Sequence, residues 1–234
     1  MGRRKREVRS EVHLRSPASP GGSDVGKPVD MPPSGVVHIV DDDRAVRESL
    51  GDLLESLHYK VALYGSASDF LKVELSDAPA CLVLDVRLPG TSGLELQEYL
   101  TKINVGIPVI LMTAFGDIPM SVRGMKLGAV DFLTKPIRDQ DLLDAITAAI
   151  RKDIDRRDDS AHLAQLQEKF ALLTTRERQV MTLVASGLMN KQVASELSIS
   201  EATVKMHRGS VMRKLGAKTA AMLVRMAETL QLQG

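Results

Sequence analysis

Cysteine and long apolar runs are what this 234-residue chain has least of. Its single cysteine, Cys81, excludes a disulfide framework and a metal site built from cysteines. Its place in an apolar segment predicts a small buried side chain. No segment approaches the roughly 18 consecutive apolar residues that a membrane-spanning helix needs, and the basic amino terminus lacks the apolar core of a secretory signal. We therefore expect a cytoplasmic protein that does not act at a membrane.

The first 35 residues have few large apolar side chains and are dense in Pro, Gly and Ser. Such a segment cannot bury enough surface to offset the entropy of ordering it. Residues 1–35 are therefore predicted to form a disordered tail. Its basic run, Arg3-Arg4-Lys5-Arg6, could contact DNA or anionic lipid, but a solvated tail is the interpretation that the composition favours.

Charge is distributed unevenly, although the formal net charge is only +1. Residues 36–150 carry 10 basic and 17 acidic side chains, a net charge of −7, whereas residues 171–234 carry 9 basic and 4 acidic ones, a net charge of +5. A chain of 234 residues is long enough for two modest domains, so the two charges can belong to separate domains. An acidic module joined to a basic one predicts a polyanionic partner for the second module alone.

From Val36 onward, short apolar strands alternate with segments of helical spacing. The predicted strands are 36–40, 60–64, 81–84, 109–112 and 130–133. The first predicted helix has a buried stripe made of Val46, Leu50, Leu53, Leu54 and Leu57. Five alternations predict an α/β fold, a flavodoxin-like doubly wound sheet of five parallel strands. Its last helix begins near Asp139 and is expected to continue into a solvated helical linker, residues 151–170.

Polar side chains follow four of these strands. Asp41-Asp42-Asp43 follows the first, Asp85 the third, Thr113 the fourth and Lys135 the fifth. In a parallel sheet they gather at one edge, where open α/β sheets bind their ligands. Converging carboxylates suit Mg²⁺, although a Ca²⁺ site or a simple acidic turn would also explain the run of three aspartates.

Asp85 beside such a cation is a competent nucleophile toward a phosphoryl group. A lysine can balance the added charge, and a hydroxyl can donate a hydrogen bond to a phosphoryl oxygen. Lys135 and Thr113 offer those two groups.

Asp41-Asp42, Asp85, Thr113 and Lys135-Pro136, in this order, resemble the receiver domain of two-component response regulators over about residues 36–150. The resemblance implies that Asp85 accepts a phosphoryl group from the phosphohistidine of a sensor histidine kinase. It also implies that Mg²⁺ is bound by Asp42, Asp85 and the main-chain carbonyl of Arg87, with Asp41 contributing partly through water.

The same resemblance implies a conformational switch. Thr113 would move toward the phosphoryl oxygens while Phe132, at the switch-aromatic position, swings inward. The bond between Lys135 and Pro136 is expected to be cis. The output face would follow Thr113, with these candidates: Met120, Val122, Met125, Lys126 and Leu127.

The basic module has four predicted helices, which makes it an all-α domain. They begin at Thr175, Asn190, Glu201 and Thr219. Thr175 is a plausible cap for the first, and Gly187 ends it. A short turn, residues 198–200, joins the second helix to a third that is rich in Lys and Arg, which is a helix-turn-helix.

Residues 171–230 resemble the LuxR-type (NarL) output domain, in particular that of the FixJ group. The matching segments are 173–180, 190–194, 203–208 and 212–215. By position, Lys205, Met206 and Gly209 lie where relatives face base edges; Lys191, Thr203, His207 and Arg208 suit phosphate contacts. Gly209 departs from the longer side chain that is common there, which puts a base contact at that position in doubt, and His207 is as compatible with a packing role.

The last predicted helix, 219–230, has Leu223, Met226, Ala227 and Leu230 on one face. In the family such a helix pairs two output domains, which would match an inverted-repeat operator. Packing within one chain is the alternative.

The sequence thus predicts a transcription regulator rather than an enzyme, activated by phosphorylation of Asp85. Its expected partners are a sensor histidine kinase, double-stranded promoter DNA, RNA polymerase and a second copy of itself. Two alternatives stay open. One is a regulator that works unphosphorylated, and the other is a Mg²⁺-dependent phosphohydrolase with an aspartyl intermediate.

Overall fold

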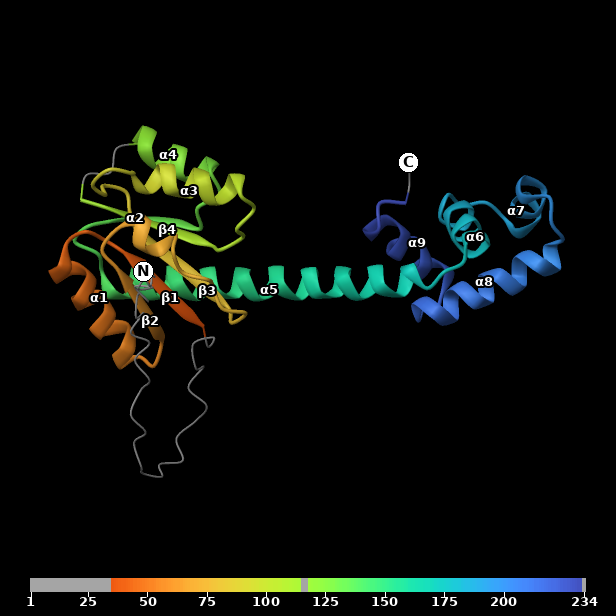
Figure 1. Cartoon of the computed structure of the whole chain (residues 1–234), viewed down its shortest axis with the longest axis horizontal. Helices are drawn as coiled ribbons and strands as arrows, with labels where there is room; N and C mark the ends of the chain where they lie inside the picture. Colours follow the sequence, from red (N-terminus) through yellow and green to blue (C-terminus); the bar gives the residue numbers. More distant parts are fainter. Residues whose placement is uncertain (1–34, 115–117, 233–234) are drawn as a thin grey trace, which may run out of the picture. The chain divides into compact units, whose positions relative to one another are not determined.

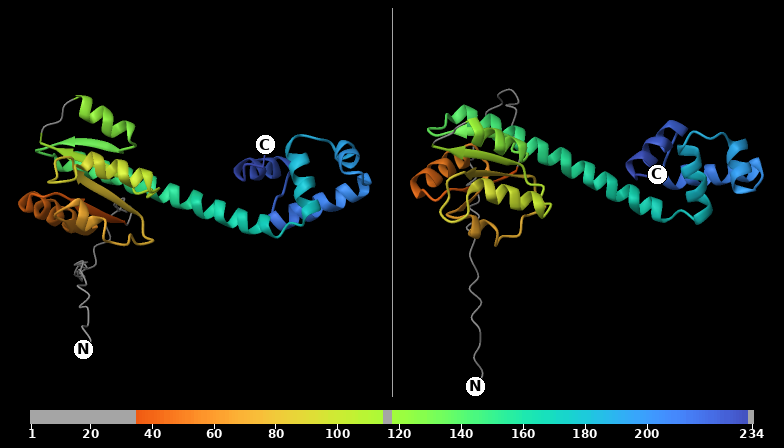
Figure 2. Two further views of the ribbon diagram at one scale, coloured as in Figure 1. Left: turned by 45° about the horizontal axis from the view of Figure 1, so that its top comes forward. Right: turned by 90° about the horizontal axis from the view of Figure 1, so that it is seen from above.

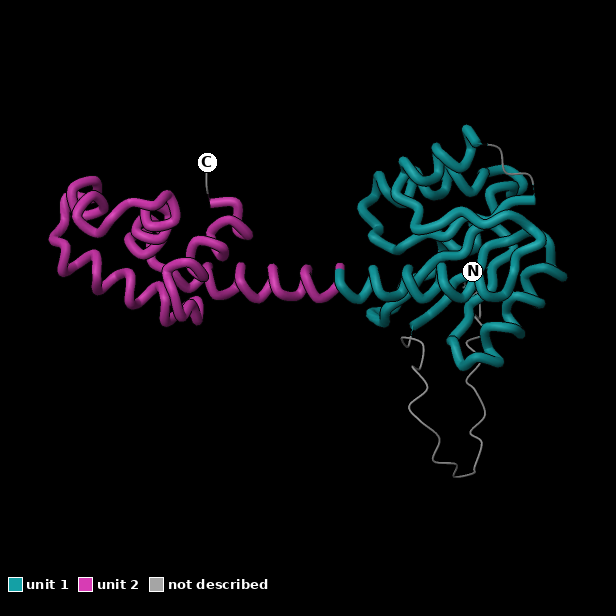
Figure 3. The backbone as a smooth tube through the Cα atoms, turned by 180° about the vertical axis from the view of Figure 1, so that it is seen from behind, with its two compact units in different colours: residues 1–155 teal, residues 156–234 magenta. Residues whose placement is uncertain are grey.

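The computed structural model describes residues 35–114 and 118–232, in two units that meet between Asp155 and Arg156 (Figure 3). The predicted tail lies outside the described residues, apart from Gly35. Among the described helices none combines the length and apolar character needed to cross a membrane. Each unit has its own hydrophobic core.

The first unit contains one sheet of five parallel strands in the order β2-β1-β3-β4-β5 (Figure 1). The strands are β1 (Val36–Val40), β2 (Lys60–Tyr64), β3 (Ala80–Asp85), β4 (Val109–Thr113) and β5 (Asp131–Thr134). This confirms the predicted doubly wound α/β fold. Strands β3 and β4 extend past their apolar runs, because Asp85 still pairs with Met112 and Thr113 with Thr134.

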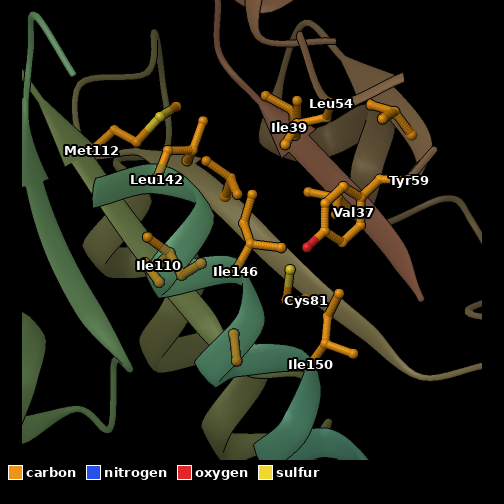
Figure 4. Packing of buried hydrophobic residues seen from close by; sticks show 14 of the residues in the cluster. Val37, Ile39, Leu54, Tyr59, Cys81, Ile110, Met112, Leu142, Ile146 and Ile150 are labelled. Carbon is orange, nitrogen blue, oxygen red and sulfur yellow. The ribbon is translucent and has the colours of Figure 1, made fainter. Parts of the chain in front are cut away.

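Helices cover both faces of this sheet. The helices are α1 (Arg44–Ser56), α2 (Ala67–Phe70), α3 (Gly93–Lys102), α4 (Ile118–Lys126) and α5 (Asp139–Ala171). Helices α1 and α5 pack on one face, where Ile146 of α5 meets Cys81 and Ile110 of the sheet (Figure 4). Helices α2, α3 and α4 pack on the other face. Cys81 is fully buried, as predicted.

The stripe predicted on α1 is only partly buried. Leu54 is fully buried, and Leu50 and Leu53 are partly buried against the same core. Leu57 is 38% exposed, because the helix ends at Ser56 and the chain turns through His58 with a φ of 67°. A periodic apolar residue that falls just past the end of a helix need not share its buried face.

Helix α5 continues without interruption from Asp139 to Ala171. The expectation of a wholly solvated segment after residue 150 is wrong at Asp153, which is fully buried. A carboxylate oxygen of Asp153 accepts a hydrogen bond of 2.9 Å from the N–H of Ala80, the first residue of β3. This hydrogen bond ties the helix to the amino-terminal end of β3, whereas the predicted acidic site lies at the carboxyl ends of the strands.

The second unit is helical, as predicted, and its helices pack against one another (Figure 2). After the end of α5 the helices are α6 (Thr175–Ala185), α7 (Asn190–Leu197), α8 (Glu201–Leu215) and α9 (Ala220–Thr229). The predicted cap of α6 is wrong by one residue, because the side chain of Thr174, not Thr175, accepts from the N–H of Glu177. Glu177 in turn accepts from the N–H of Thr174, which completes a capping box.

Candidate functional site

Three carboxylates meet at the carboxyl ends of β1 and β3. One oxygen each of Asp41, Asp42 and Asp85 lies within 4.8 Å of the other two. Asp41 and Asp85 are buried, whereas Asp42 is exposed. Like charges this close repel one another unless a cation lies between or beside them. The arrangement offers only oxygen ligands and an open side, which suits Mg²⁺.

Lys135 reaches this cluster from the end of β5. Its Nζ lies 2.6 Å from Oδ2 of Asp41 and 2.5 Å from Oδ2 of Asp85. Burial alone would lower the pKa of Lys135, but its hydrogen bonds to the two carboxylates, together with their charges, raise that pKa above its usual value. The amine therefore stays charged and offsets part of the negative charge. The bond between Lys135 and Pro136 is cis, as predicted.

The main chain and side chain of Asp41 are both held in place. Its N–H donates to the carbonyl oxygen of Tyr64, and its Oδ1 accepts from the N–H of Asp43 at 2.9 Å. Burial raises the pKa of Asp41, against the lowering effect of Lys135. Asp43 has a different role, since its side chain caps α1 by accepting from the N–H groups of Ala45 and Val46.

Asp85 sits in a tight turn at the end of β3. Its Oδ1 accepts from the N–H of Arg87 at 2.9 Å. A Cβ at Gly93 would lie 2.3 Å from the carbonyl oxygen of Asp85, so only glycine fits there. The role predicted for the main-chain carbonyl of Arg87 as a metal ligand stays a prediction.

Thr113 and Phe132 lie on the neighbouring strands. Thr113 is fully buried at the end of β4, and its carbonyl oxygen accepts from the N–H of Lys135 at 2.8 Å. Phe132 is half-buried and packs at the edge of the second core. A Cβ at Gly124 of α4 would lie 3.6 Å from Cδ2 of Phe132 and 2.4 Å from a methyl group of Leu111, so this glycine allows α4 to approach the sheet closely.

The candidates for an output face separate into two groups. Met120 and Leu127 pack against the second core, whereas Val122 and Met125 are 46% and 47% exposed on α4. Lys126 is exposed as well. Only the exposed members are available for contact with another molecule.

Sequence reasoning missed one residue beside the acidic cluster. Arg47 of α1 donates from Nη1 to the main-chain oxygen of Asp41 at 2.5 Å. Helical periodicity could not identify Arg47, because an arginine in the first turn of a helix carries no signal in the sequence that tells where its side chain points.

The predicted DNA-contacting side chains fall into two groups on the second unit. Lys205, Met206 and Gly209 are exposed along α8, with Met206 at 62%. Lys191, at the start of α7, is exposed too. No atom among the described residues lies within 4 Å of a Cβ built on Gly209, so the free protein has room for a side chain there.

The remaining three residues are half-buried at the sides of α8. Thr203 shares a hydrogen bond of 2.8 Å with the hydroxyl of Ser200, the cap of this helix. Arg208 donates to Oδ1 of Asn190 at 3.1 Å, which links α8 to α7. His207 is half-buried as well. Thr203 and Arg208 thus have internal roles besides any contact with phosphate.

A second polar cluster, at the start of α6, was not anticipated. Glu177 is 5% exposed and accepts from Nζ of Lys214 at 2.7 Å and from the hydroxyl of Ser210 at 2.5 Å. These hydrogen bonds, first among them the one from Lys214, lower the pKa of Glu177 to about 2. The cluster joins α6 to α8 and fixes the orientation of the predicted reading helix.

The last helix, α9, packs within its own unit. Leu223 and Ala227 are fully buried, and Met226 and Leu230 lie against the same core. The face predicted to pair two chains is therefore largely internal, because these residues complete the core of the four helices. Pairing through α9 would have to use its outer side, where Met222 is 39% exposed.

Two family models match this chain, one in each unit. A model described as the response regulator receiver domain matches residues 37–147. Another, described as bacterial regulatory proteins of the luxR family, matches residues 171–227. The two matches coincide with the parallel sheet and with the four helices.

Relatives are similar over most of their length. Nodulation protein W of Bradyrhizobium diazoefficiens is 52% identical over 195 residues, 83% of this chain and 86% of that protein. Response regulator protein TodT of Pseudomonas putida is 44% identical over 198 residues, 85% and 87% of the two chains. Transcriptional regulatory protein FixJ of Azorhizobium caulinodans is 43% identical over 197 residues, 84% and 93% of the two chains.

Solved structures are similar as well. The response regulator StyR is 49% identical, with a TM-score of 0.71, over 82% of this chain and 98% of that chain. Full-length FixJ from B. japonicum is 39% identical, with a TM-score of 0.51, over 86% of this chain and 98% of that chain.

Proposed function

The chain belongs to the two-component response regulators that join a receiver domain to a LuxR-type DNA-binding domain, and from this premise we propose that Asp85 is the residue its sensor histidine kinase phosphorylates. The observation that carries this proposal is the convergence of Asp41, Asp42 and Asp85 with the amine of Lys135. Among these carboxylates, Asp85 is the one that ends the central strand β3, while the amine of Lys135 contacts Asp85 and Asp41 alike.

In the proposed reaction a carboxylate oxygen of Asp85 attacks the phosphorus of a phosphohistidine, and the bond from phosphorus to the imidazole nitrogen breaks. Asp41, Asp42 and Asp85 would hold Mg²⁺, which supplies positive charge next to the transferred group. The N–H of Arg87 keeps one oxygen of Asp85 in place. Lys135 contributes a charge within reach of the oxygens of the acyl phosphate.

We propose that the added charge drives the switch. A phosphoryl group carries about −2 at neutral pH and strong acceptor oxygens, so it favours the conformation in which Thr113 and Lys135 approach it. Phe132, half-buried here, would then turn further inward beside Gly124. A shift of the population from 1:99 to 99:1 needs a preference of about 5.5 kcal/mol.

The proposed output is DNA binding that regulates transcription in the cytoplasm. Phosphorylation would promote a homodimer whose two α8 helices read an inverted repeat about one helical turn apart, next to RNA polymerase. Lys205 and Met206 would face base edges, and Lys191 and Arg208 would contact phosphates. Support comes from the exposure of Lys205, Met206 and Lys191 and from the net charge of +5 on residues 171–234.

The phosphorylation step is tested by incubating the full chain with acetyl phosphate and Mg²⁺ and mapping the modification by mass spectrometry. We expect one acid-stable, base-labile phosphoryl group on Asp85, none in Asp85→Ala, and normal labelling of Asp52→Ala, which removes an exposed carboxylate from α1. Absence of label in the wild type would favour a regulator that works unphosphorylated. Continuous release of phosphate would favour a phosphohydrolase.

A further inference from the structure

We propose that Arg47 is a positioning residue for the metal-binding loop, residues 41–43. This inference rests on the proposed function, because it concerns the Mg²⁺ site that phosphorylation of Asp85 requires. Arg47 does not itself meet the metal or the phosphoryl group in this proposal. It acts through the main chain that carries two of the three carboxylates.

Arg47 contacts the loop at one defined atom. Nη1 donates to the main-chain oxygen of Asp41 at 2.5 Å. That oxygen belongs to the peptide group that joins Asp41 to Asp42, and a peptide group is planar and rigid. Holding this plane fixes where the Cα of Asp42 lies relative to Asp41, and so limits the directions open to the Asp42 side chain.

The guanidinium of Arg47 also lies near Gly65. A Cβ built on Gly65 would lie 3.7 Å from Nη1 of Arg47 and 3.9 Å from Cζ and Nη2, so the group lies against the residue that follows β2. The adjacent Tyr64 accepts the N–H of Asp41 through its carbonyl oxygen. Asp41 is therefore held at both its N–H and its C=O, once by the strand end and once by Arg47.

The exposed Asp42 makes this support important. Asp41 is also held by Lys135 and by the N–H of Asp43, whereas Asp42 is on the open side of the cluster. The peptide plane that Arg47 holds is the one immediately before Asp42. Without that hydrogen bond, the Asp42 carboxylate would sample directions away from the other two.

A contribution to the stability of α1 does not explain why an arginine occupies position 47. Arg47 lies in the first turn of α1, where the positive end of the helix dipole disfavours a cation. Arg44, in the same turn, forms an exposed ion pair with Glu48. The guanidinium of Arg47 is instead directed at the loop, where its positive charge opposes the binding of Mg²⁺.

The two effects of Arg47 on Mg²⁺ have opposite signs, which makes the proposal testable. Loss of its charge alone should tighten Mg²⁺ binding, because one repulsion is removed. Loss of its hydrogen bond should weaken binding, and partners that orient metal ligands are typically worth 10–100-fold in affinity. We expect the positional effect to exceed the charge effect.

The experiment is titration calorimetry of Mg²⁺ with the full chain, wild type and variants. Arg47→Met should bind about tenfold more weakly, while its melting temperature in EDTA stays within a few degrees of wild type. The matched control is Arg44→Met, which removes the same charge from the same helical turn without touching the loop. Its affinity should be unchanged or slightly higher.

The proposal would be overturned if folded Arg47→Met bound Mg²⁺ as tightly as wild type or more tightly. If that variant does not fold, Arg47→Lys replaces it. This variant keeps the charge but cannot present the same planar donor, so its affinity should be intermediate, and an unchanged affinity would overturn the proposal as well. Failure of the wild type itself to bind Mg²⁺ would instead refute the metal site of the proposed function.

Discussion

The acidic cluster of Asp41, Asp42 and Asp85 and the polar cluster around Glu177 differ in how well their charges are matched. In the first unit, Asp41 and Asp85 share one amine, that of Lys135, and burial raises the pKa of Asp41. In the second unit, Glu177 alone receives Lys214, Ser210 and a main-chain N–H, and its pKa falls to about 2. A cluster whose negative charge is only partly balanced is suited to bind a cation, whereas a carboxylate whose charge is balanced by its partners stabilises the fold.

The largest expected difference concerns stability. Glu177→Gln removes the charge that receives Lys214 and Ser210, which should lower the unfolding free energy of the second unit by about 2 kcal/mol. All three tyrosines lie in residues 59–99, so tyrosine fluorescence reports on the first unit alone, whereas far-UV circular dichroism reports on both. We expect the variant to shift the dichroism transition and leave the fluorescence transition in place.

Glu196→Gln is the control, since it removes an exposed carboxylate from α7. If Glu177→Gln and Glu196→Gln melt alike, the matched cluster does not stabilise the second unit and the contrast between the two clusters fails.

The second-largest expected effect is on DNA affinity, and it tests whether the second unit contacts DNA bases through α8. Lys205→Ala should weaken binding to a target operator about tenfold, as expected for one base contact. Lys191→Ala should weaken binding to all sequences alike and reduce the slope of log K against log salt by about 1. Fluorescence anisotropy at several salt concentrations measures both.

Lys218→Ala removes an exposed charge outside the predicted surface and should change little. An effect of Lys218→Ala as large as that of Lys205→Ala would mean that net charge, and not the α8 surface, determines binding.

The smallest effect is the pH dependence of the matched cluster. Because the folded-state pKa of Glu177 lies below its usual value of 4.5, at about 2, its contribution is fully present above pH 4.5 and is lost as the pH falls toward 2. The melting difference between wild type and Glu177→Gln should therefore shrink over this range. A difference that stays constant down to pH 2 would contradict the charged state assigned to Glu177.

The strands and the edge at which their polar residues meet could be predicted from the sequence, for a physical reason. Parallel strands with both faces covered are continuously apolar, so Asp85 and Thr113 stand out where such runs end. Arg47, Asp153 and Glu177 could not be found in the same way. Their partners depend on tertiary packing, as when Asp153 meets the start of β3, 73 residues earlier in the chain.

The limits of helices were also less predictable than their existence. Leu57 fits the periodicity of α1 but lies past its end, and Thr174 rather than Thr175 caps α6. Both outcomes depend on which main-chain groups find a partner at a helix end, and apolar periodicity carries no information about this.

The central claim, that the acidic cluster controls DNA binding through Asp85, is tested most directly by one measurement. The affinity of the full chain for its upstream promoter region is measured by anisotropy at fixed salt, with and without beryllofluoride and Mg²⁺, for wild type and Asp85→Ala. We predict that beryllofluoride tightens binding by wild type at least tenfold and leaves the variant unchanged. An equal response of the two proteins, or none in the wild type, would contradict the account.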